Sequence, residues 1–355
     1  MEYGHGGDIY APSLKEKALL DFSVNLNPLG IPPKVKAVFG TLAEECEAYP
    51  DPFCRELKHA LAKHEGIAEE CILFGNGAAD LIYRIAYGLR PKKVLLPAPT
   101  FSEYEAAAVQ VGAEIAYHPL LEEDGFSLDK RFLDALRQHQ PDMVFLCNPN
   151  NPTGRLIPKG LLMQIADYCQ AHGAFLIVDE CFLDMAAGGE ACSMKTELSR
   201  YPQLLVLKAF TKFFAMAGLR LGYLFSGAET VRMRVESAGQ PWSVSVPAQR
   251  CGLAALTDTA YIMETKRLLP ELGEALYKQL SELPVKVYPS AANYFLLKTD
   301  RSDLKERLLE KGILIRSCSN YRGLREGYFR VAVKSAEDNG QLMAALREID
   351  FKERR

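Results

Sequence analysis

Lys212 has the residue type and the surroundings of a nucleophilic amine. It follows a strand-like run, stands among aromatic and small residues, and is followed eight positions later by Arg220. A lysine near apolar groups has a lowered pKa, and its neutral amine attacks aldehydes. The hydroxyl of Thr211 and the guanidinium of Arg220 could both hold a phosphate. The segment suits an aldehyde that carries a phosphate, although a lysine and an arginine on an ordinary loop would look the same in sequence.

Asp179 is the second chemical signal, because it ends the apolar run from Phe175 to Val178. A buried carboxylate is costly unless it meets a partner. A protonated ring nitrogen would be one such partner, whereas a helix N-cap is the structural alternative. Pyridoxal phosphate offers an aldehyde, a phosphate and a ring nitrogen, so Lys212 and Asp179 together indicate this cofactor.

Two turns after other strand-like runs add to this set. The turn from Gly75 to Ala79 leads into a helical pattern, so its backbone N–H groups can bind a phosphate, although a plain tight turn is also possible. The turn from Asn148 to Gly154 holds two Asn-Pro pairs. Because prolines stiffen a turn, we expect Asn151 to face a ligand rather than to serve a purely structural turn.

The elements that must position these residues form an α/β pattern. Continuous apolar runs alternate with amphipathic stretches such as 159–172, which predicts strands buried on both faces of a mostly parallel sheet. Ligands bind at the carboxyl ends of such strands, where all four signals lie. The predicted strands are 94–96, 143–147, 175–178, 204–207 and 221–225.

Three regions are expected along the chain: an N-terminal arm over 1–30, a large α/β domain over 31–240 and a small α+β domain over 241–355. The arm ends in a turn-rich cluster. The small domain should begin with a long helical stretch to about 282. Its predicted strands are 285–288, 293–297 and 328–333.

Composition narrows the possible partners. With 355 residues, 48% of them hydrophobic, the chain can bury a large core, and a net charge of −3 argues against nucleic acid or an anionic membrane. Nine cysteines without a Cys-x-x-Cys pair and six histidines without ligand spacing indicate no metal. No apolar run approaches the roughly 20 residues that span a bilayer. The first residues have no basic leader and no apolar stretch, so we expect no signal peptide. The cysteines fit a reducing cytoplasm.

In combination, these motifs resemble the fold-type I pyridoxal-phosphate enzymes of the aminotransferase class I/II superfamily. The resemblance rests on Asn-Pro-x-Asn-Pro-Thr-Gly, Asp-Glu-x-aromatic, and Thr-Lys with an arginine eight residues later. Within that superfamily the chain is similar to the threonine-phosphate decarboxylases of cobalamin biosynthesis, which are close to the histidinol-phosphate aminotransferases. The His5-Gly6-Gly7 opening, the segment 21–30 and Ile315-Arg316-Ser317-Cys318 carry this narrower likeness.

The resemblance implies a role for each matching residue. Lys212 would carry the cofactor covalently and later move protons, Asp179 would pair with the ring nitrogen, and Phe101 would stack on the ring, although it could otherwise be a core aromatic. The other cofactor contacts implied are Gly77, Ala78, Ala79, Asn151, Thr211, Arg220 and, from a partner subunit, Tyr49. A homodimer is therefore expected. The substrate contacts implied are His5, Gly6, Asn25, Asn151, Arg316 and Arg330.

Two positions depart from the wider superfamily. Phe182 stands where many aminotransferases have a tyrosine, and Ala209 replaces a common serine. A phenylalanine has no donor for the cofactor's phenolic oxygen, which argues mildly against a general aminotransferase. Without the serine hydroxyl, phosphate binding would depend more on Arg220 and on backbone N–H groups.

The expected reaction is decarboxylation of L-threonine O-3-phosphate to (R)-1-aminopropan-2-yl phosphate. Arg330 would bind the substrate carboxylate and Arg316 would lie nearer its phosphate, although a strand-edge salt bridge is the structural alternative for Arg330. Transamination of histidinol phosphate and decarboxylation of L-serine O-phosphate are the alternatives. A binding protein without catalysis and a nicotinamide enzyme are disfavoured, the latter because Asp80 replaces the third glycine of a dinucleotide motif.

Overall fold

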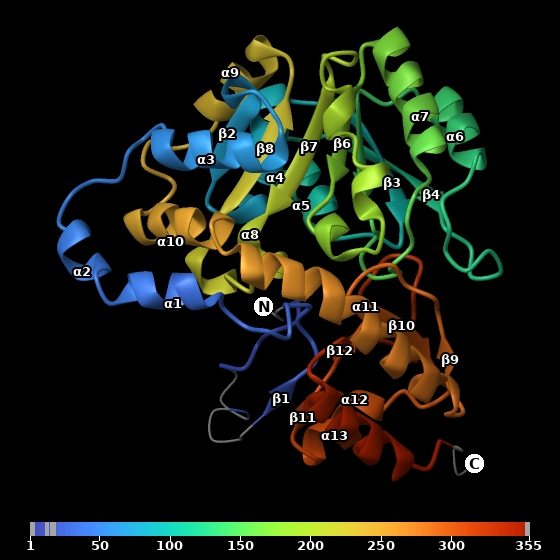
Figure 1. Ribbon diagram of the computed structural model, residues 1–355. Helices are drawn as coiled ribbons and strands as arrows, with labels where there is room; N and C mark the ends of the chain where they lie inside the picture. Colours follow the sequence, from blue (N-terminus) through green and yellow to red (C-terminus); the bar gives the residue numbers. More distant parts are fainter. Residues whose placement is uncertain (1–3, 11–13, 15–18, 352–355) are drawn as a thin grey trace.

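A computed structural model describes residues 4–10, 14 and 19–351. Its main element is a seven-stranded sheet in the order β2-β8-β7-β6-β5-β3-β4, with helices on both faces (Figure 1). The strands are β2 Ile72–Gly75, β3 Lys93–Ala98, β4 Glu114–Pro119, β5 Met143–Cys147, β6 Phe175–Asp179, β7 Leu204–Ala209 and β8 Gly222–Ser226. Only β8 runs antiparallel to its neighbours, so the sheet is mostly parallel, as predicted.

Alternate side chains of each strand enter two different cores. In β5, Val144 and Leu146 pack on one face, and Met143, Phe145 and Cys147 pack on the other. One core is closed by α4 Gly77–Leu89, α5 Glu103–Gln110 and α9 Glu229–Ser237. The opposite core is closed by other helices: α1 Pro33–Phe39, α2 Leu42–Glu45, α3 Arg55–Glu65, α6 Arg131–His139, α7 Lys159–His172 and α10 Val246–Leu256. Burial on both faces explains why these strands are continuously apolar.

A smaller sheet forms from the C-terminal part of the chain. Its order is β12-β13-β10-β9, with β9 Lys286–Val287, β10 Tyr294–Lys298, β12 Arg316–Ser317 and β13 Tyr328–Ala332. The helices α11 Thr259–Ser281, α12 Leu304–Glu310 and α13 Ala336–Arg347 supply apolar side chains to its core. From the N-terminal segment, β1 Leu20–Asp21 pairs in parallel with β11 Ile313–Leu314, so the arm lies against the C-terminal elements (Figure 1).

Several predicted bounds agree with the structure and others do not. The strand 143–147 and the helix 159–172 have the predicted bounds. The long helical stretch is two helices, because the side chain of Asp258 caps the second by accepting from the backbone N–H of Tyr261. The edge strand β4 was not predicted, because its residues form no apolar run. The domain limits at 30/31 and 240/241 stay predictions.

Candidate active site

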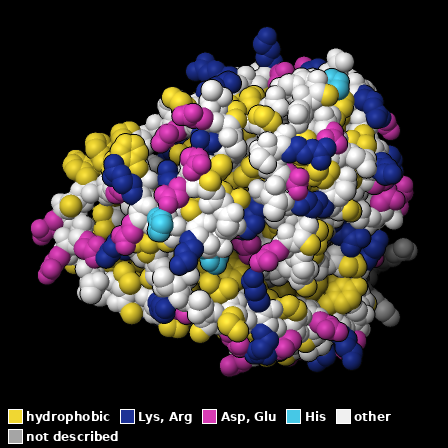
Figure 2. All heavy atoms as spheres, turned by 45° about the horizontal axis from the view of Figure 1, so that its top comes forward, with side chains coloured by type: hydrophobic (Ala, Val, Ile, Leu, Met, Phe, Trp, Pro, Cys, Tyr) yellow, Lys and Arg dark blue, Asp and Glu magenta, His cyan; other side chains and the backbone are white. Residues whose placement is uncertain are grey.

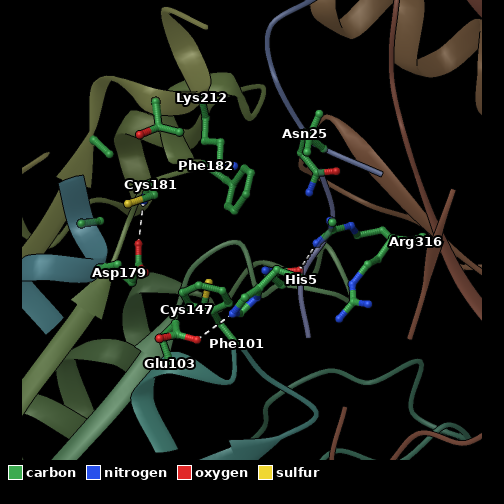
Figure 3. Close-up of a pocket in the computed structure, with 18 of the residues that line it drawn as sticks. His5, Asn25, Phe101, Glu103, Cys147, Asp179, Cys181, Phe182, Lys212 and Arg316 are labelled. Carbon is green, nitrogen blue, oxygen red and sulfur yellow. Dashed lines mark hydrogen bonds and ion pairs between the residues drawn. The ribbon is translucent and has the colours of Figure 1, made fainter. Parts of the chain in front are cut away.

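A pocket of about 400 Å³ lies where the large sheet, the N-terminal arm and the smaller sheet meet (Figure 3). All predicted site residues except Gly77 and Tyr49 line it. Those that do are His5, Gly6, Asn25, Ala78, Ala79, Phe101, Asn151, Asp179, Thr211, Lys212, Arg220, Arg316 and Arg330. The strand ends of β5, β6 and β7 contribute Cys147, Asp179 and Ala209, so the pocket lies at the carboxyl edge of the sheet.

Lys212 lies on the short helix α8 (Phe210–Phe213), directly after β7. Asn27, from the N-terminal arm, binds the helix α8. Its backbone N–H donates to the carbonyl of Lys212 (3.1 Å), and its side-chain amide donates to the carbonyl of Phe213 (2.7 Å). Desolvation, together with the positive charges of Arg330 and Arg220, lowers the pKa of Lys212 to about 8. The amine is therefore far more available as a nucleophile than an ordinary lysine.

A cradle for a phosphate forms at the start of α4. The glycine at 77 has φ +82°, and an added Cβ there would lie 2.5 Å from Nη2 of Arg220, so the guanidinium packs directly on the backbone. A Cβ on Gly222 would lie 2.4 Å from the backbone nitrogen of Ala78, so the strand also requires a glycine. The helix N-terminus, with Ala78 and Ala79 in the pocket lining, faces Thr211 and Arg220. Free N–H groups, a hydroxyl and a guanidinium are the donors that a phosphate needs.

Asp179 is buried at the end of β6. Its Oδ2 accepts from the hydroxyl of Tyr104 (2.7 Å), and its Oδ1 accepts from the backbone N–H of Cys181 (3.0 Å). Desolvation raises the pKa of Asp179 despite these donors. A cationic ring nitrogen in the pocket would compensate this buried carboxylate.

The two neighbouring asparagines after β5 have different tasks. Asn150 is structural, since its amide donates to the carbonyl of Pro99 (2.9 Å) and to Thr153 Oγ1 (2.9 Å). Asn151 faces the pocket, where its Oδ1 accepts from Nη1 of Arg330 and from the hydroxyl of Tyr321 (3.3 Å). The side chain of Asn151 therefore lies in the pocket wall, and its contact with a ligand stays a prediction.

Arg330 is a buried cation held at the pocket wall by β13. Its Nη2 donates to the carbonyl of Ser23 (2.8 Å). The amide of Asn25 lies 3.3 Å from Nη1 and Nε of Arg330, with its oxygen turned toward the guanidinium in the orientation that satisfies both groups. No carboxylate pairs with Arg330 among the described residues, so the salt bridge considered above for this arginine is absent there.

The His-Gly-Gly motif brings the arm onto the pocket. A Cβ on Gly6 would lie 2.3 Å from the carbonyl oxygen of Ser23, and Gly7 has φ +84° while its N–H donates to Ser23 Oγ (2.8 Å). Arg316 donates from Nη2 to the carbonyl of Gly4. Small residues are thus required for the close approach that sets His5 beside the pocket.

Several pocket-lining residues were not predicted from the sequence, and one predicted residue, Tyr49, lies outside the pocket. Glu103 and Tyr104 at the start of α5, and Tyr321 after β12, gave no motif signal, although Tyr104 follows Phe101 by three residues. Tyr49 lies outside the pocket and is 80% exposed, with its ring 4.8 Å from that of Trp242. Tyr49 was predicted to contact the cofactor of a partner subunit, and that contact stays a prediction.

These features define the class of protein. The mostly parallel sheet of this α/β fold brings four features to one pocket: a low-pKa lysine, a buried strand-end aspartate, an aromatic ring and a phosphate cradle. This combination defines a fold-type I pyridoxal-phosphate enzyme. The pocket volume lies within the range of roughly 300–1,000 Å³ typical of cofactor sites. The residues present therefore fit this cofactor.

Comparison with known proteins names the family. The chain belongs to the family described as aminotransferase class I and II, which matches residues 17–349. It is 42% identical over 352 residues to a threonine-phosphate decarboxylase of Salmonella typhimurium, covering 97% of this chain and 96% of that protein.

Solved structures agree on the fold. A histidinol-phosphate aminotransferase from Clostridium acetobutylicum has a TM-score of 0.87 at 28% identity, and an L-threonine-O-3-phosphate decarboxylase from Porphyromonas gingivalis has 0.82 at 26%. Each match covers 93% of this chain and 98% of the other.

Two further properties concern ligands and surfaces. Within the described ranges, no cluster of three or more His, Cys, Asp or Glu side chains could hold a metal ion, and no helix is long and apolar enough to cross a membrane. Figure 2 shows basic and acidic side chains interspersed over one face of the molecule. That face therefore carries no large field of one sign.

Proposed function

We propose that the protein decarboxylates L-threonine O-3-phosphate to (R)-1-aminopropan-2-yl phosphate, with pyridoxal phosphate as cofactor, in cobalamin biosynthesis. The observation that carries this proposal is the placement of Arg316 and Arg330 on one pocket with Lys212. An amino acid that bears a phosphate has two anionic groups, which two arginines can address separately. The 42% identity to a threonine-phosphate decarboxylase supports the same substrate.

The cofactor roles that we propose follow the donors and charges in the pocket. Lys212 attaches the cofactor and Asp179 holds the ring nitrogen in its protonated form. Phe101 stacks on the ring, and Asn151 donates to its phenolic oxygen. The phosphate contacts proposed are Gly77, Ala78, Ala79, Thr211 and Arg220.

The substrate roles that we propose use the opposite wall. Arg330, which has no carboxylate partner among the described ion pairs, binds the substrate carboxylate with help from Asn25 and Asn151. Arg316 binds the phosphate, together with His5 and the backbone of Gly6. Each charge-assisted bond would contribute about 1.5–3 kcal/mol.

The choice of reaction depends on the orientation of the substrate. Bound pyridoxal phosphate would supply an electron sink for the bond that breaks at the substrate Cα. Arg330 and Arg316 would set which bond at Cα is broken, by fixing the carboxylate and the phosphate. For decarboxylation, the carboxylate leaves as CO2, and Lys212, with a pKa of about 8, returns a proton to Cα.

The test is product analysis. Protein loaded with pyridoxal phosphate should release CO2 from L-threonine O-3-phosphate, and absence of CO2 would refute the proposal. Amino transfer from histidinol phosphate to 2-oxoglutarate would instead support the aminotransferase alternative, which is consistent with the likeness to the Clostridium protein. L-serine O-phosphate lacks one methyl group, which is worth only about 1–3 kcal/mol, so kcat/KM for both substrates should be compared.

Two accompanying proposals concern assembly and location. The exposed Tyr49 ring beside Trp242 supports a homodimer in which Tyr49 reaches the partner's cofactor phosphate. Sedimentation of the loaded protein at twice the chain mass would support it, and a monomer at micromolar concentration would contradict it. We place the protein in the cytoplasm because its free cysteines suit a reducing compartment.

A further inference from the structure

Glu103 is an acidic side chain in a pocket that should bind anions. It lines the same cavity as Arg316 and Arg330. Like charges in a partly buried site repel one another, so Glu103 by itself would weaken the binding of a phosphorylated amino acid. None of the roles proposed above uses this carboxylate.

The carboxylate of Glu103 is fixed by two donors from different parts of the chain. Its Oε1 lies 2.7 Å from Nε2 of His5 on the arm (Figure 3). Its Oε2 accepts from the hydroxyl of Tyr83 on α4 (3.0 Å). The hydrogen bond from His5 and, more weakly, that from Tyr83 hold the pKa of Glu103 below its usual range, against its desolvation. Glu103 is therefore ionised at neutral pH, and Tyr83 anchors its carboxylate to helix α4.

The side chain of His5 contacts both Glu103 and Phe101. The arm backbone has its own anchors, since Gly4 accepts from Arg316 and Asn320, and Gly7 donates to Ser23. These bonds are made by Gly4 and Gly7 and do not involve the imidazole of His5. The bond to Glu103 and the packing of the imidazole on Phe101, with 5.7 Å between ring centroids, restrict the side-chain torsions of His5.

We propose that Glu103 is a positioning residue, whose carboxylate fixes the imidazole of His5 over the pocket so that His5 can bind the phosphate of the substrate. This inference rests on the proposed function for the nature of the ligand. Because Glu103 acts only through His5, its benefit should vanish when His5 is removed. In a variant without the His5 side chain, Glu103 would only repel the phosphate.

A double-mutant cycle with inorganic phosphate as the probe tests this directly. The dissociation constant is measured by titration calorimetry on protein loaded with pyridoxal phosphate, for wild type, His5→Ala, Glu103→Ala and the double variant. Each single variant should bind about tenfold more weakly. The double variant should bind no more weakly than His5→Ala and up to a few-fold more tightly. Losses that multiply in the double variant would overturn the proposal.

Kinetics and a conservative variant add a second readout. Glu103→Ala should raise KM for L-threonine O-3-phosphate about tenfold and change kcat less than about threefold. Glu103→Gln keeps an acceptor for His5 and should recover part of that loss. If Glu103→Ala fails to fold, as judged by circular dichroism, Glu103→Gln and Tyr83→Phe replace it in the cycle, with smaller shifts in the same direction. A fall in kcat with an unchanged KM would contradict a role in binding.

The chain offers a matched control. Glu69 pairs with His59 at the same 2.7 Å, but on the surface and outside the pocket lining. Glu69→Gln should leave phosphate affinity and KM unchanged. Absence of CO2 from the wild-type protein would refute the proposed function while the phosphate cycle could still be measured. CO2 release with multiplicative losses in the cycle would refute the role of Glu103 alone.

Discussion

The guanidinium of Arg220 packs so closely on Gly77 that a Cβ on that glycine would lie 2.5 Å from Nη2. We expect Gly77→Ala to displace the arginine, and the positive φ adds backbone strain. One lost charge-assisted bond of about 1.5–3 kcal/mol corresponds to roughly tenfold to hundredfold weaker binding of pyridoxal phosphate. The dissociation constant, measured by equilibrium dialysis of the apoprotein, checks this.

Gly273 provides the control for that substitution. It lies inside α11, and a Cβ there would meet no atom within 4 Å. Gly273→Ala should leave cofactor affinity unchanged and stabilise the fold by about 0.5–1 kcal/mol. Cofactor binding by Gly77→Ala at wild-type strength would show that the packing of Arg220 on the glycine does not matter.

The pKa of Lys212 should control capture of the cofactor. Since the neutral amine is the nucleophile, the attachment rate should rise about tenfold per pH unit below pH 8 and level off above it. Borohydride trapping at a series of pH values, followed by mass spectrometry of the labelled peptide, measures this profile. A midpoint near 10 would mean that burial and the nearby arginines do not act on Lys212.

The same trapping experiment contains an internal control. Lys208 lies four residues earlier and is ion-paired at 2.8 Å with both Glu65 and Asp184. Those carboxylates raise its pKa although burial opposes this. Lys208 should therefore remain unlabelled at every pH, and Lys212→Arg should abolish labelling.

Arg316 should matter for the phosphate of the substrate. Arg316→Ala is expected to raise KM for L-threonine O-3-phosphate about tenfold to hundredfold, since a charge-assisted bond is lost. Steady-state kinetics of CO2 release measures this. Arg322→Ala is the control, because Arg322 pairs with Glu105 at 2.9 Å and does not line the pocket. Equal effects of the two substitutions would argue for general electrostatics instead of a specific contact.

The stability of the fold should depend on the buried carboxylate of Glu65 and its lysine partners. Glu65 accepts from Lys208 (2.8 Å), Lys195 (2.6 Å) and Tyr223 (2.8 Å). Removing one partner of a buried pair costs about 3–5 kcal/mol, so Glu65→Gln should lower the free energy of unfolding by that amount. Urea denaturation followed by circular dichroism measures it, with Glu69→Gln as the exposed control. A loss below about 1 kcal/mol would contradict the burial argument.

The same carboxylate gives a pH dependence of known sign. Burial would raise the pKa of Glu65, but the charges of Lys208 and Lys195 lower it to about 2, below the unfolded value near 4.5. The folded state therefore holds the ionised form more strongly. Its stabilisation is present above about pH 4.5 and is lost as pH falls toward 2. Glu65→Gln should show a smaller loss of stability across this window than wild type.

The sequence predicts the interior of the large sheet well and its edge strand β4 poorly. Strands such as β5 are buried on both faces, so their residues must be apolar throughout. The edge strand β4 pairs only with β3 and exposes Glu114 and Pro119, so packing leaves no pattern in its sequence. The side chain of Asp258 caps the start of α11 and so separates it from α10. A reading of the apolar pattern alone does not reveal this cap.

Site residues could be predicted where the neighbouring sequence marks them. They could not be predicted where distant segments come together only in the folded protein. Lys212 and Asp179 each follow an apolar run, so position along the chain reveals them. Glu103 and Tyr321 acquire their place only when α5 and the segment after β12 meet the arm at the pocket. No spacing in the sequence connects His5 with Glu103, since the contact joins residues 98 positions apart.

The pairing of β1 with β11 determines when the active site can exist. Leu20 and Asp21 are made almost 300 residues before their partners Ile313 and Leu314. At about 5–20 residues per second, the N-terminal segment waits for tens of seconds before its strand is complete. His5 and Asn25 depend on the same late assembly. A nascent chain can therefore fold much of its large sheet and still be unable to recognise its substrate until the C-terminal elements emerge.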